Sequence, residues 1–138
     1  MAAGKLIEIE ILTPLQQIYK GDVESIIGQA EDGFFGVLYN HATMLAALTF
    51  GTLTVREPGG KERVFVTSDG FFEINKNKAA VLVDTAEARR DIDLKRAEEA
   101  RLRAEKRLHS KEMVDTTRAE AALHRAIIRI KAAQTKRS

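Results

Sequence analysis

The first half of the chain alternates hydrophobic and polar residues in short segments, which is the pattern of β-strands. Between Leu6 and Leu12, isoleucine occupies every second position and glutamate stands in between. This period of two places the two kinds of side chain on opposite faces of a strand, so one face is expected to be buried. Pro14 follows closely and cannot donate a backbone hydrogen bond, so we expect the strand to end before it.

Five further segments have the composition of strands and are separated by residues that favour turns. They are residues 23–30, 52–57, 62–67, 70–74 and 79–84. Pro58, Gly59 and Gly60 predict a hairpin turn between two of them, and residues 75–78 predict a second. Short strands with frequent turns favour an antiparallel sandwich or barrel over a parallel sheet. For residues 40–48 we expect a short helical turn instead.

After Thr85 the hydrophobic spacing becomes that of an α-helix, and no glycine or proline interrupts it. Two helices are predicted, the first with a narrow apolar stripe and the second with a wider one. The stripes are Ala97, Ala100, Ala104 and Leu108, and then Ala119, Ala122, Leu123, Ala126, Ile127, Ile130 and Ala133. Residues 109–115 are the expected bend, and Thr117 with Glu120 fits a capping box. Because alanine lets two backbones approach closely, we expect an antiparallel helical hairpin.

Composition and charge change at the same place in the chain. All glycine, proline and aromatic residues lie at or before Phe72. Residues 1–88 contain seven Lys and Arg against twelve Asp and Glu, whereas residues 89–138 contain fifteen against eight. We therefore predict an α+β protein with two domains: an N-terminal antiparallel β-sandwich over residues 1–88, followed by a C-terminal antiparallel two-helix hairpin over residues 89–138. The basic hairpin is expected to face an acidic partner.

The sequence lacks the common signatures of a catalyst. It contains no cysteine, which excludes disulfides, thiolate metal sites and cysteine nucleophiles. It has neither a GxxxxGK(S/T) phosphate loop nor a GxSxG motif, and His41, His109 and His124 lack the spacing of metal ligands. The N-terminus has no apolar signal core, and no apolar run is long enough to cross a bilayer. We expect an intracellular protein, soluble or peripheral to a membrane, without enzymatic activity of its own.

Four arginines of the helical segment are spaced so that they share faces of the two helices. They are Arg96 and Arg103, seven residues apart on the first helix, and Arg125 and Arg129, four apart on the second. An antiparallel fold-back brings both pairs to one end of the hairpin, where they would suit a polyphosphate with an attached base. Asp93 could accept hydrogen bonds from that ligand. In a plainer interpretation, Asp93 or Asp91 caps the helix and the arginines form a solvated face.

The start of the helical segment carries a motif of a known family. Residues Ile92-Asp93-Leu94-Lys95-Arg96-Ala97 fit the I/L-D-x-x-R-A nucleotide motif of the epsilon subunit of bacterial rotary F-type ATP synthase. Two earlier segments resemble the same family, namely residues 32–38 followed by Asn40-His41-Ala42, and residues 68–74. With the change from strands to helices, the resemblance spans essentially all 138 residues. Tyr39 and Thr43 stand where this loop of the family commonly has prolines.

The resemblance implies a non-catalytic subunit of the central stalk. The β-sandwich would lie against the gamma subunit and touch the c-ring of the membrane sector, so the subunit would be peripheral at the cytoplasmic face of the cell membrane. The helical domain would resist ATP hydrolysis when it extends toward the alpha/beta catalytic hexamer, and would permit turnover when it is folded down as a hairpin. The resemblance thus implies membership of a complex that couples ATP synthesis to proton transport.

The resemblance also implies ATP as a regulatory ligand, which holds the hairpin folded down in the family members that bind it. Carried over by motif position, the nucleotide-binding residues are Glu87, Ile92, Asp93, Arg96, Ala97, Arg103, Arg125 and Arg129. Each position has the residue type that the family motif expects. No catalytic and no metal-ligating residue is implied, and the part played by Mg²⁺ stays open.

The charge of the second helix suggests how an extended helical domain would inhibit ATP hydrolysis. The second helix and its end would present Arg118, Arg125, Arg129, Lys131, Lys136 and Arg137 to acidic surfaces of the catalytic subunits. Two alternatives stay open: a structural stalk adaptor whose hairpin never switches, and a basic helical module that binds nucleic acid. Interspersed acidic residues, and the absence of aromatic residues after Phe72, count against nucleic acid because bases would have no ring on which to stack.

Overall fold

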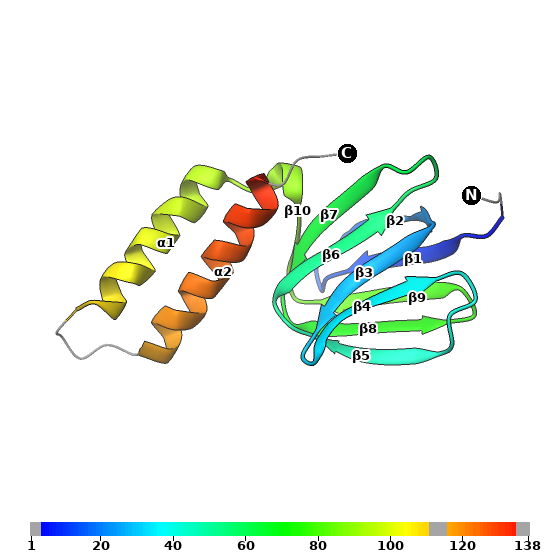
Figure 1. Cartoon of the computed structure of the whole chain (residues 1–138), viewed down its shortest axis with the longest axis horizontal. Coiled ribbons are helices and arrows are strands. Elements are labelled where there is room, and N and C mark those ends of the chain that lie inside the picture. The colour runs from blue at the N-terminus through cyan, green and yellow to red at the C-terminus, as the bar shows by residue number, and fades with distance from the viewer. Residues whose placement is uncertain (1–3, 111–115, 135–138) are drawn as a thin grey trace.

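The computed structural model describes residues 4–110 and 116–134 of the chain (Figure 1). Over these residues it contains ten strands, a 3₁₀ turn and two α-helices. The strands are β1 (Ile7–Leu12), β2 (Gln17–Val23), β3 (Ser25–Ala30), β4 (Gly33–Leu38), β5 (Met44–Leu48), β6 (Gly51–Arg56), β7 (Glu62–Thr67), β8 (Gly70–Asn75), β9 (Lys78–Val83) and β10 (Ala86–Ala88). The helical elements are η1 (Arg89–Asp91), α1 (Leu94–Leu108) and α2 (Thr116–Gln134). The predicted α+β class, a β-sandwich followed by a helical hairpin, is confirmed.

The strands form two layers along one hydrogen-bonded path. The order is β10-β7-β6-β3-β5-β8-β9-β1-β2, and β4 pairs with β3 beside this path. The path passes from one layer to the other between β3 and β5, where Ala30 stands opposite Leu48. The two layers face each other in Figure 1, and their inner faces enclose the hydrophobic core.

One strand pair departs from the antiparallel arrangement expected from the sequence. β1 and β9 run parallel, with Ile9 opposite Ala79 and Ile11 opposite Val81. The other paired strands of the described chain are antiparallel. Side chains alternate between the two faces in both kinds of pairing, so the hydrophobic pattern of β1 could not distinguish them.

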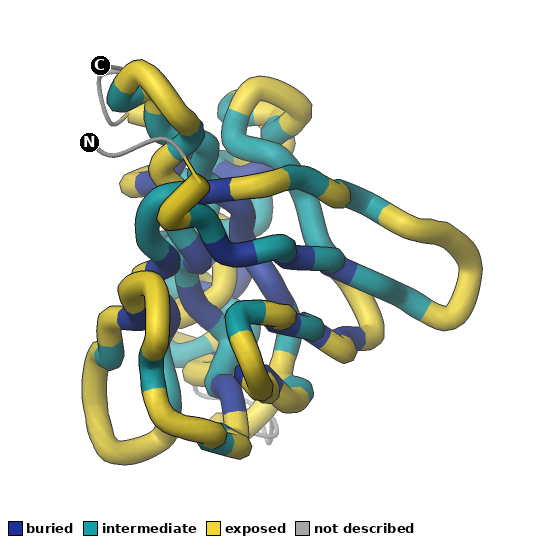
Figure 2. Tube along the Cα trace, turned by 90° about the vertical axis from the view of Figure 1, so that its right-hand side faces the viewer, coloured by how far each residue is buried: buried dark blue, intermediate teal, exposed yellow. Residues whose placement is uncertain are grey.

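The core consists of alternate residues of the strands. Ile7, Ile9 and Ile11 are fully buried, as the alternation in the sequence predicted. Figure 2 shows this alternation along the strands, with exposed residues concentrated at the turns. Burial of one such side chain contributes about 1.5–3 kcal/mol. Other fully buried members of the core are Val23, Ile26, Val37, Leu53, Val55, Phe72, Ile74 and Val81.

Both predicted hairpin turns are present. Between β6 and β7, Gly59 and Gly60 have φ values of 92° and 91°, which residues with a side chain rarely adopt. The Gly60 N–H donates to the Glu57 carbonyl oxygen at 2.9 Å and closes this turn. Between β8 and β9, Lys76 and Asn77 both have positive φ, as a type I′ turn requires.

The helical turn expected over residues 40–48 is wrong, because Met44–Leu48 form strand β5. This strand pairs with β8, and it buries Leu48 while leaving Leu45 exposed. Apolar residues occupy both of its faces, so its sequence shows no alternation. Strands β2, β4 and β10 were also not predicted.

Side-chain hydrogen bonds hold the loop in which Tyr39 and Thr43 replace prolines. The Asn40 N–H donates to Asn77 Oδ1 at 2.7 Å, and Asn77 Nδ2 donates to Asn40 Oδ1 at 3.3 Å. Thr43 Oγ1 donates to Asn75 Oδ1 at 3.1 Å. These bonds tie the loop to the β8–β9 turn, and they restrain it where proline rings would otherwise do so.

The two helices lie side by side and antiparallel, and α2 is the one that packs on the sandwich (Figure 1). Their buried residues within the described ranges are all alanines. They are Ala97 and Ala104 in α1, and Ala119, Ala126 and Ala132 in α2. The predicted hairpin is therefore confirmed. Its fully buried side chains are small, and larger ones such as Leu123, Ile127 and Ile130 are half-buried.

The ends of the helices agree only in part with the predicted caps. Asp93 caps α1, since its Oδ1 accepts a hydrogen bond from the Arg96 N–H at 3.0 Å. Helix α2 already begins at Thr116, so Thr117 lies inside the helix and does not precede it as a cap. Residues 111–115 of the predicted bend lie outside the described residues.

Gly70 provides a test of the packing between β8 and β9. A Cβ added there would overlap the Leu82 carbonyl oxygen and lie 3.0 Å from Val83 Cα. We predict that Gly70→Ala lowers the free energy of unfolding by about 1–3 kcal/mol, measured by urea denaturation, because the backbone must shift. Gly36→Ala is the matched control, since a Cβ there meets nothing within 4 Å. Equal losses in the two variants would contradict this account.

Candidate functional site

An ion pair joins the hairpin to the sandwich. Arg129 of α2 donates from Nε to Glu87 Oε1 at 2.6 Å. The two side chains are 32% and 34% exposed, so solvent screens their attraction only in part. Glu87 is placed by the pairing of β10 with β7, where it lies opposite Val66. Two of the residues predicted to bind a nucleotide are thus in direct contact.

Phe50 also contacts Arg129, although the sequence analysis did not select it. The guanidinium carbon of Arg129 lies 5.1 Å from the centre of the Phe50 ring, which is within the range of a cation–π interaction. Phe50 is half-buried and directly precedes β6. It belongs to none of the three motifs, so no signal in the sequence related it to α2.

The contact between Asp93 and Arg96 is a helix-capping hydrogen bond and not an ion pair. The bond to Asp93 comes from the backbone N–H of Arg96, and the Arg96 residue itself is exposed. The plainer interpretation of Asp93, as a cap, is therefore correct. A carboxylate has two oxygens, so Asp93 retains an acceptor for another ligand while it caps the helix.

The rest of the predicted nucleotide set is spread over the start of the hairpin and its two helices. Arg96, Arg103 and Arg125 are exposed, whereas Ala97 is buried and Ile92 is half-buried. Within the described part of the chain, Glu87 and Arg129 are the members of the set joined by a hydrogen bond between two side chains. The fold places the other arginines on the exposed surface of the hairpin.

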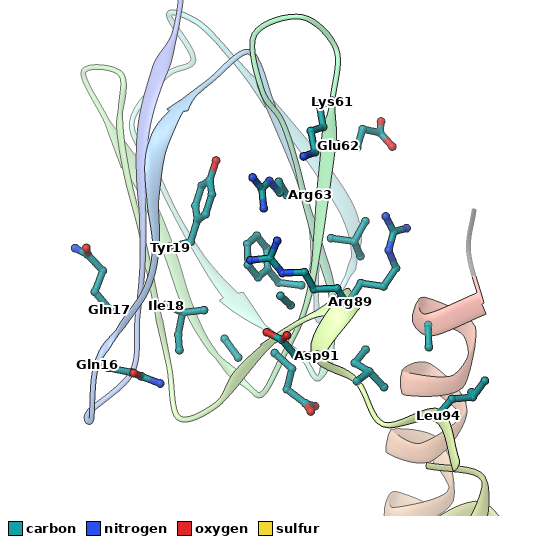
Figure 3. Close-up of a pocket in the computed structure, with 18 residues that line it drawn as sticks. Gln16, Gln17, Ile18, Tyr19, Lys61, Glu62, Arg63, Arg89, Asp91 and Leu94 are labelled. Carbon is teal, nitrogen blue, oxygen red and sulfur yellow. The ribbon is translucent and has the colours of Figure 1, made fainter. Parts of the chain in front are cut away.

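A cavity of about 890 Å³ lies between the sandwich and the start of the hairpin (Figure 3). Its walls come from β2, from β7, from residues 86–92 and from Leu94 and Ala133 of the two helices. Its charged lining residues are Lys61, Glu62, Arg63, Glu87, Arg89, Arg90 and Asp91. Of the predicted nucleotide set, only Glu87 and Ile92 line this cavity.

Tyr19, Glu57 and Arg63 form a hydrogen-bonded group beside the cavity. The Tyr19 hydroxyl donates to Glu57 Oε2 at 2.6 Å, and Arg63 Nε donates to Glu57 Oε1 at 3.3 Å. Burial, followed by the bond to Glu57, raises the pKa of Tyr19 above its ordinary value. The same bond lowers the pKa of Glu57. At neutral pH, Tyr19 therefore stays protonated and Glu57 stays charged, so Glu57 balances Arg63.

Each layer of the sandwich exposes large apolar side chains on its outer face. On β5, β8 and β9 they are Leu45, Phe71 and Leu82, and on β3 and β4 they are Ile27, Phe34 and Leu38. Phe71 and Leu82 stand directly opposite each other across β8 and β9. Grouped apolar side chains of this kind are typical of surfaces that bind other proteins.

The described residues contain no helix that is long and apolar enough to cross a membrane. They also contain no cluster of three or more His, Asp or Glu that could hold a metal ion. Nδ1 of His41 lies 2.7 Å from the carbonyl oxygen of its neighbour Ala42. This agrees with the interpretation of His41 as a loop histidine bonded to adjacent residues.

The whole described region matches two models of one protein family. Residues 6–89 match the model of the ATP synthase delta/epsilon chain, beta-sandwich domain. Residues 90–134 match the model of the ATP synthase delta/epsilon chain, long alpha-helix domain. The two matches follow each other without a gap, in the order of strands and helices in the structure.

Two relatives and two solved structures extend this comparison. The ATP synthase epsilon chain of Natranaerobius thermophilus is 41% identical over 138 residues, which cover 99% of this chain and 98% of that protein. The ATP synthase epsilon chain of Desulforamulus reducens is 42% identical over 132 residues, which cover 95% and 99%.

Among solved structures, a chain of the mitochondrial ATP synthase of Euglena gracilis has a TM-score of 0.84 at 23% identity, covering 98% of this chain and 85% of that one. A chain from the central stalk and c-ring of the Tetrahymena thermophila mitochondrial enzyme has a TM-score of 0.63 at 16% identity, covering 92% and 96%. At these identities the structures support the fold. The family models and the relatives, which match over nearly the whole length, show that this chain belongs to the epsilon chain family of F-type ATP synthases.

Proposed function

We propose that this chain is a non-catalytic central-stalk subunit whose helical hairpin restrains ATP hydrolysis when it leaves the sandwich. The observation that carries this proposal is the difference in packing between the two parts. The sandwich encloses isoleucine, valine and phenylalanine side chains, whereas the described residues buried in the helices are alanines. The hairpin is therefore the part of the molecule that can move at low cost in free energy.

The kind of side chain that the helices bury supports a weakly held hairpin. Each alanine removes one methyl group from water, which is far less apolar area than an isoleucine removes. Leu102 of α1 is 57% exposed, and the larger apolar side chains of α2, such as Ile127 and Ile130, are only half-buried. The helices are rich in strong helix formers, so each could persist after the hairpin opens. Docked and extended states are thus close in free energy.

ATP is the proposed ligand of the docked hairpin. Arg96 lies in the first turn of α1 and Arg129 near the end of α2, so antiparallel packing brings both to the same end. Arginine matches phosphate oxygens bidentately, and Asp93 retains an acceptor oxygen. ATP at a hundredfold excess over its Kd would stabilise the docked form by about 2.7 kcal/mol. This is enough to invert the populations of two states that are similar in free energy.

Before nucleotide binds, Arg129 holds the hairpin on the sandwich through its ion pair with Glu87. The Glu87–Arg129 ion pair and the Phe50 ring hold α2 on the sandwich. A phosphate that approaches Arg129 would compete with the Glu87 carboxylate, because both are anionic acceptors for the same guanidinium. We infer that nucleotide binding replaces this ion pair, so that docking is maintained by a stronger set of contacts.

The surfaces of the sandwich and the charge of α2 suggest the partners. We assign the outer face with Leu45, Phe71 and Leu82 to the gamma subunit, and the β3–β4 surface with Phe34 to the c-ring, since both surfaces are apolar and exposed. Contact with the c-ring would place the subunit at the cytoplasmic face of the cell membrane. The extended basic α2 would engage acidic surfaces of the alpha/beta hexamer.

A structural adaptor whose hairpin never switches is the second candidate. The contacts of Arg129 with Glu87 and Phe50 favour it, because they hold the hairpin docked without a ligand. A shift of the melting temperature on addition of ATP separates the two candidates, since an adaptor without a nucleotide site would show none.

We predict that Arg96→Gln weakens ATP binding about 10- to 100-fold in calorimetry, since a hydrogen bond to a charged group contributes about 1.5–3 kcal/mol. Asp93→Asn tests the carboxylate without loss of the cap, because asparagine caps helices as well as aspartate does. Lys95→Gln, at an adjacent exposed position, is the control. Unchanged affinity in both Arg96→Gln and Asp93→Asn would refute the site.

Deletion of residues 93–138 should raise the ATPase activity of the assembled complex several-fold and leave assembly intact. The deletion retains β10 and both apolar faces of the sandwich, so the stalk contacts are kept. The measurements are the rate of ATP hydrolysis and the subunit stoichiometry of the purified complex. An assembled complex that hydrolyses ATP no faster would show that the hairpin does not inhibit.

Glu87→Gln and Phe50→Leu should each shift the hairpin toward the undocked state by roughly 1.5- to 5-fold. The basis is about 0.2–1 kcal/mol for a partly exposed ion pair and about 0.5–1 kcal/mol for a cation–π contact. Energy transfer between labels on the sandwich and α2 of the isolated subunit measures the shift. Glu73→Gln, which removes one exposed carboxylate on β8, is the control. The contacts do not hold the hairpin if all three variants behave alike.

A further inference from the structure

Arg101 of α1 lies on the face by which the two helices pack together. It follows Ala97 by four residues and precedes Ala104 by three, and both alanines are buried. Side chains at these spacings share one face of a helix. Helix α1 packs on α2, beside which it lies in Figure 1. The fold therefore places a charged residue, which is only half-buried, between two alanines of the helix–helix interface.

One nitrogen of this side chain is buried without a hydrogen-bond acceptor. It is Nε, and among the described residues it is the one buried side-chain nitrogen or oxygen atom in this condition. The end of the guanidinium reaches solvent, where Nη1 lies 3.8 Å from Glu105 Oε2 and both side chains are 40% exposed. The charge of Arg101 is thus solvated, and the polar group left without a partner is its Nε–H.

A buried donor without an acceptor opposes the packing that buries it. In water the Nε–H donates to solvent, and this hydrogen bond is lost when α1 and α2 close on each other. Most buried polar groups of native proteins have a partner, so an exception calls for an explanation. We propose that Arg101 destabilises the closed helix pair and thereby keeps the hairpin able to open. Its unpaired Nε–H raises the free energy of the closed state, whereas opening restores the bond to water.

The packing of the two helices makes this cost significant. Their fully buried side chains are alanines, and larger ones such as Ile127 and Ile130 are only half-buried. Such packing contributes less hydrophobic free energy than the core of the sandwich, so one lost hydrogen bond moves the equilibrium between closed and open helices measurably. An aliphatic residue at position 101 would remove the cost and would continue the apolar stripe between Ala97 and Ala104.

Separation of the helices also frees the guanidinium of Arg101. It then joins basic residues of α2, such as Arg125, on the surface that the open domain presents to an acidic partner. Arg101 thus disfavours the closed state and adds a cation to the open one. This consequence for inhibition rests on the proposed function, whereas the effect of Arg101 on the helix pair does not.

Arg101→Lys tests the proposal with a minimal change. Lysine has a methylene group in the place of Nε, and it retains the positive charge and the helix propensity of arginine. We expect the closed population to rise at least about fivefold relative to the open one, which corresponds to the lower limit of the cost of a buried donor without an acceptor. The measurement is energy transfer between labels on α1 and α2 of the full-length chain, followed through a urea titration. Arg101→Met, which also removes the Nε–H, should shift the equilibrium in the same direction.

Arg107→Lys is the matched control, since it makes the same exchange at an exposed position of α1 and should change nothing. A closed population that stays the same or falls in Arg101→Lys would overturn the proposal, and so would an equal shift in the two lysine variants. The assembled complex separates this inference from the proposed function, because Arg101→Lys should there raise the rate of ATP hydrolysis. A helix pair that closes more firmly without faster hydrolysis would leave the role of Arg101 standing and refute inhibition by the hairpin.

Discussion

The contact of Arg129 with Glu87 and Phe50 ties the helical hairpin to the sandwich at a defined place. The fully buried side chains of the helices are alanines and their larger apolar side chains are only half-buried, so the packing of the helices supplies less hydrophobic free energy than the core of the sandwich. The guanidinium group of Arg129 adds a specific polar and cation–π contact to this packing. Because this group also belongs to the proposed nucleotide set, the residue that docks the hairpin is the residue that a phosphate would engage.

The sandwich provides a rigid frame for this weak contact. Its core is formed by large side chains that alternate along the strands, and β10 extends one layer by three residues before the chain turns into η1. Pairing of β10 with β7 fixes the position of Glu87, and the start of β6 fixes that of Phe50. The sandwich thus presents defined contact sites for the hairpin.

The same frame also carries the exposed apolar surfaces of the molecule. Its outer faces leave apolar side chains exposed on both layers, while the hairpin and the cavity lie at the β6–β7 side. The loop at residues 39–43 is held in place without the prolines that are common in the family. There, Asn40 and Thr43 bond to the neighbouring turn and restrain the loop through tertiary contacts.

The sequence by itself determined the features that depend on neighbouring residues. The alternation of hydrophobic and polar residues predicted β1, the glycine and asparagine residues predicted the turns, and the change to helical spacing predicted the hairpin. These predictions succeed because backbone preference and side-chain direction are local properties. The nucleotide motif includes Asp93, and the preference of aspartate for the residue before a helix also predicted that Asp93 caps α1.

Only the tertiary structure decided what depends on distant segments. It showed that β5 is a strand, that β1 and β9 are parallel, that Phe50 lies under Arg129, and that a cavity opens beside Tyr19. The physical reason is that these features arise where surfaces from separate parts of the chain meet. No pattern within one segment specifies which surface it will meet.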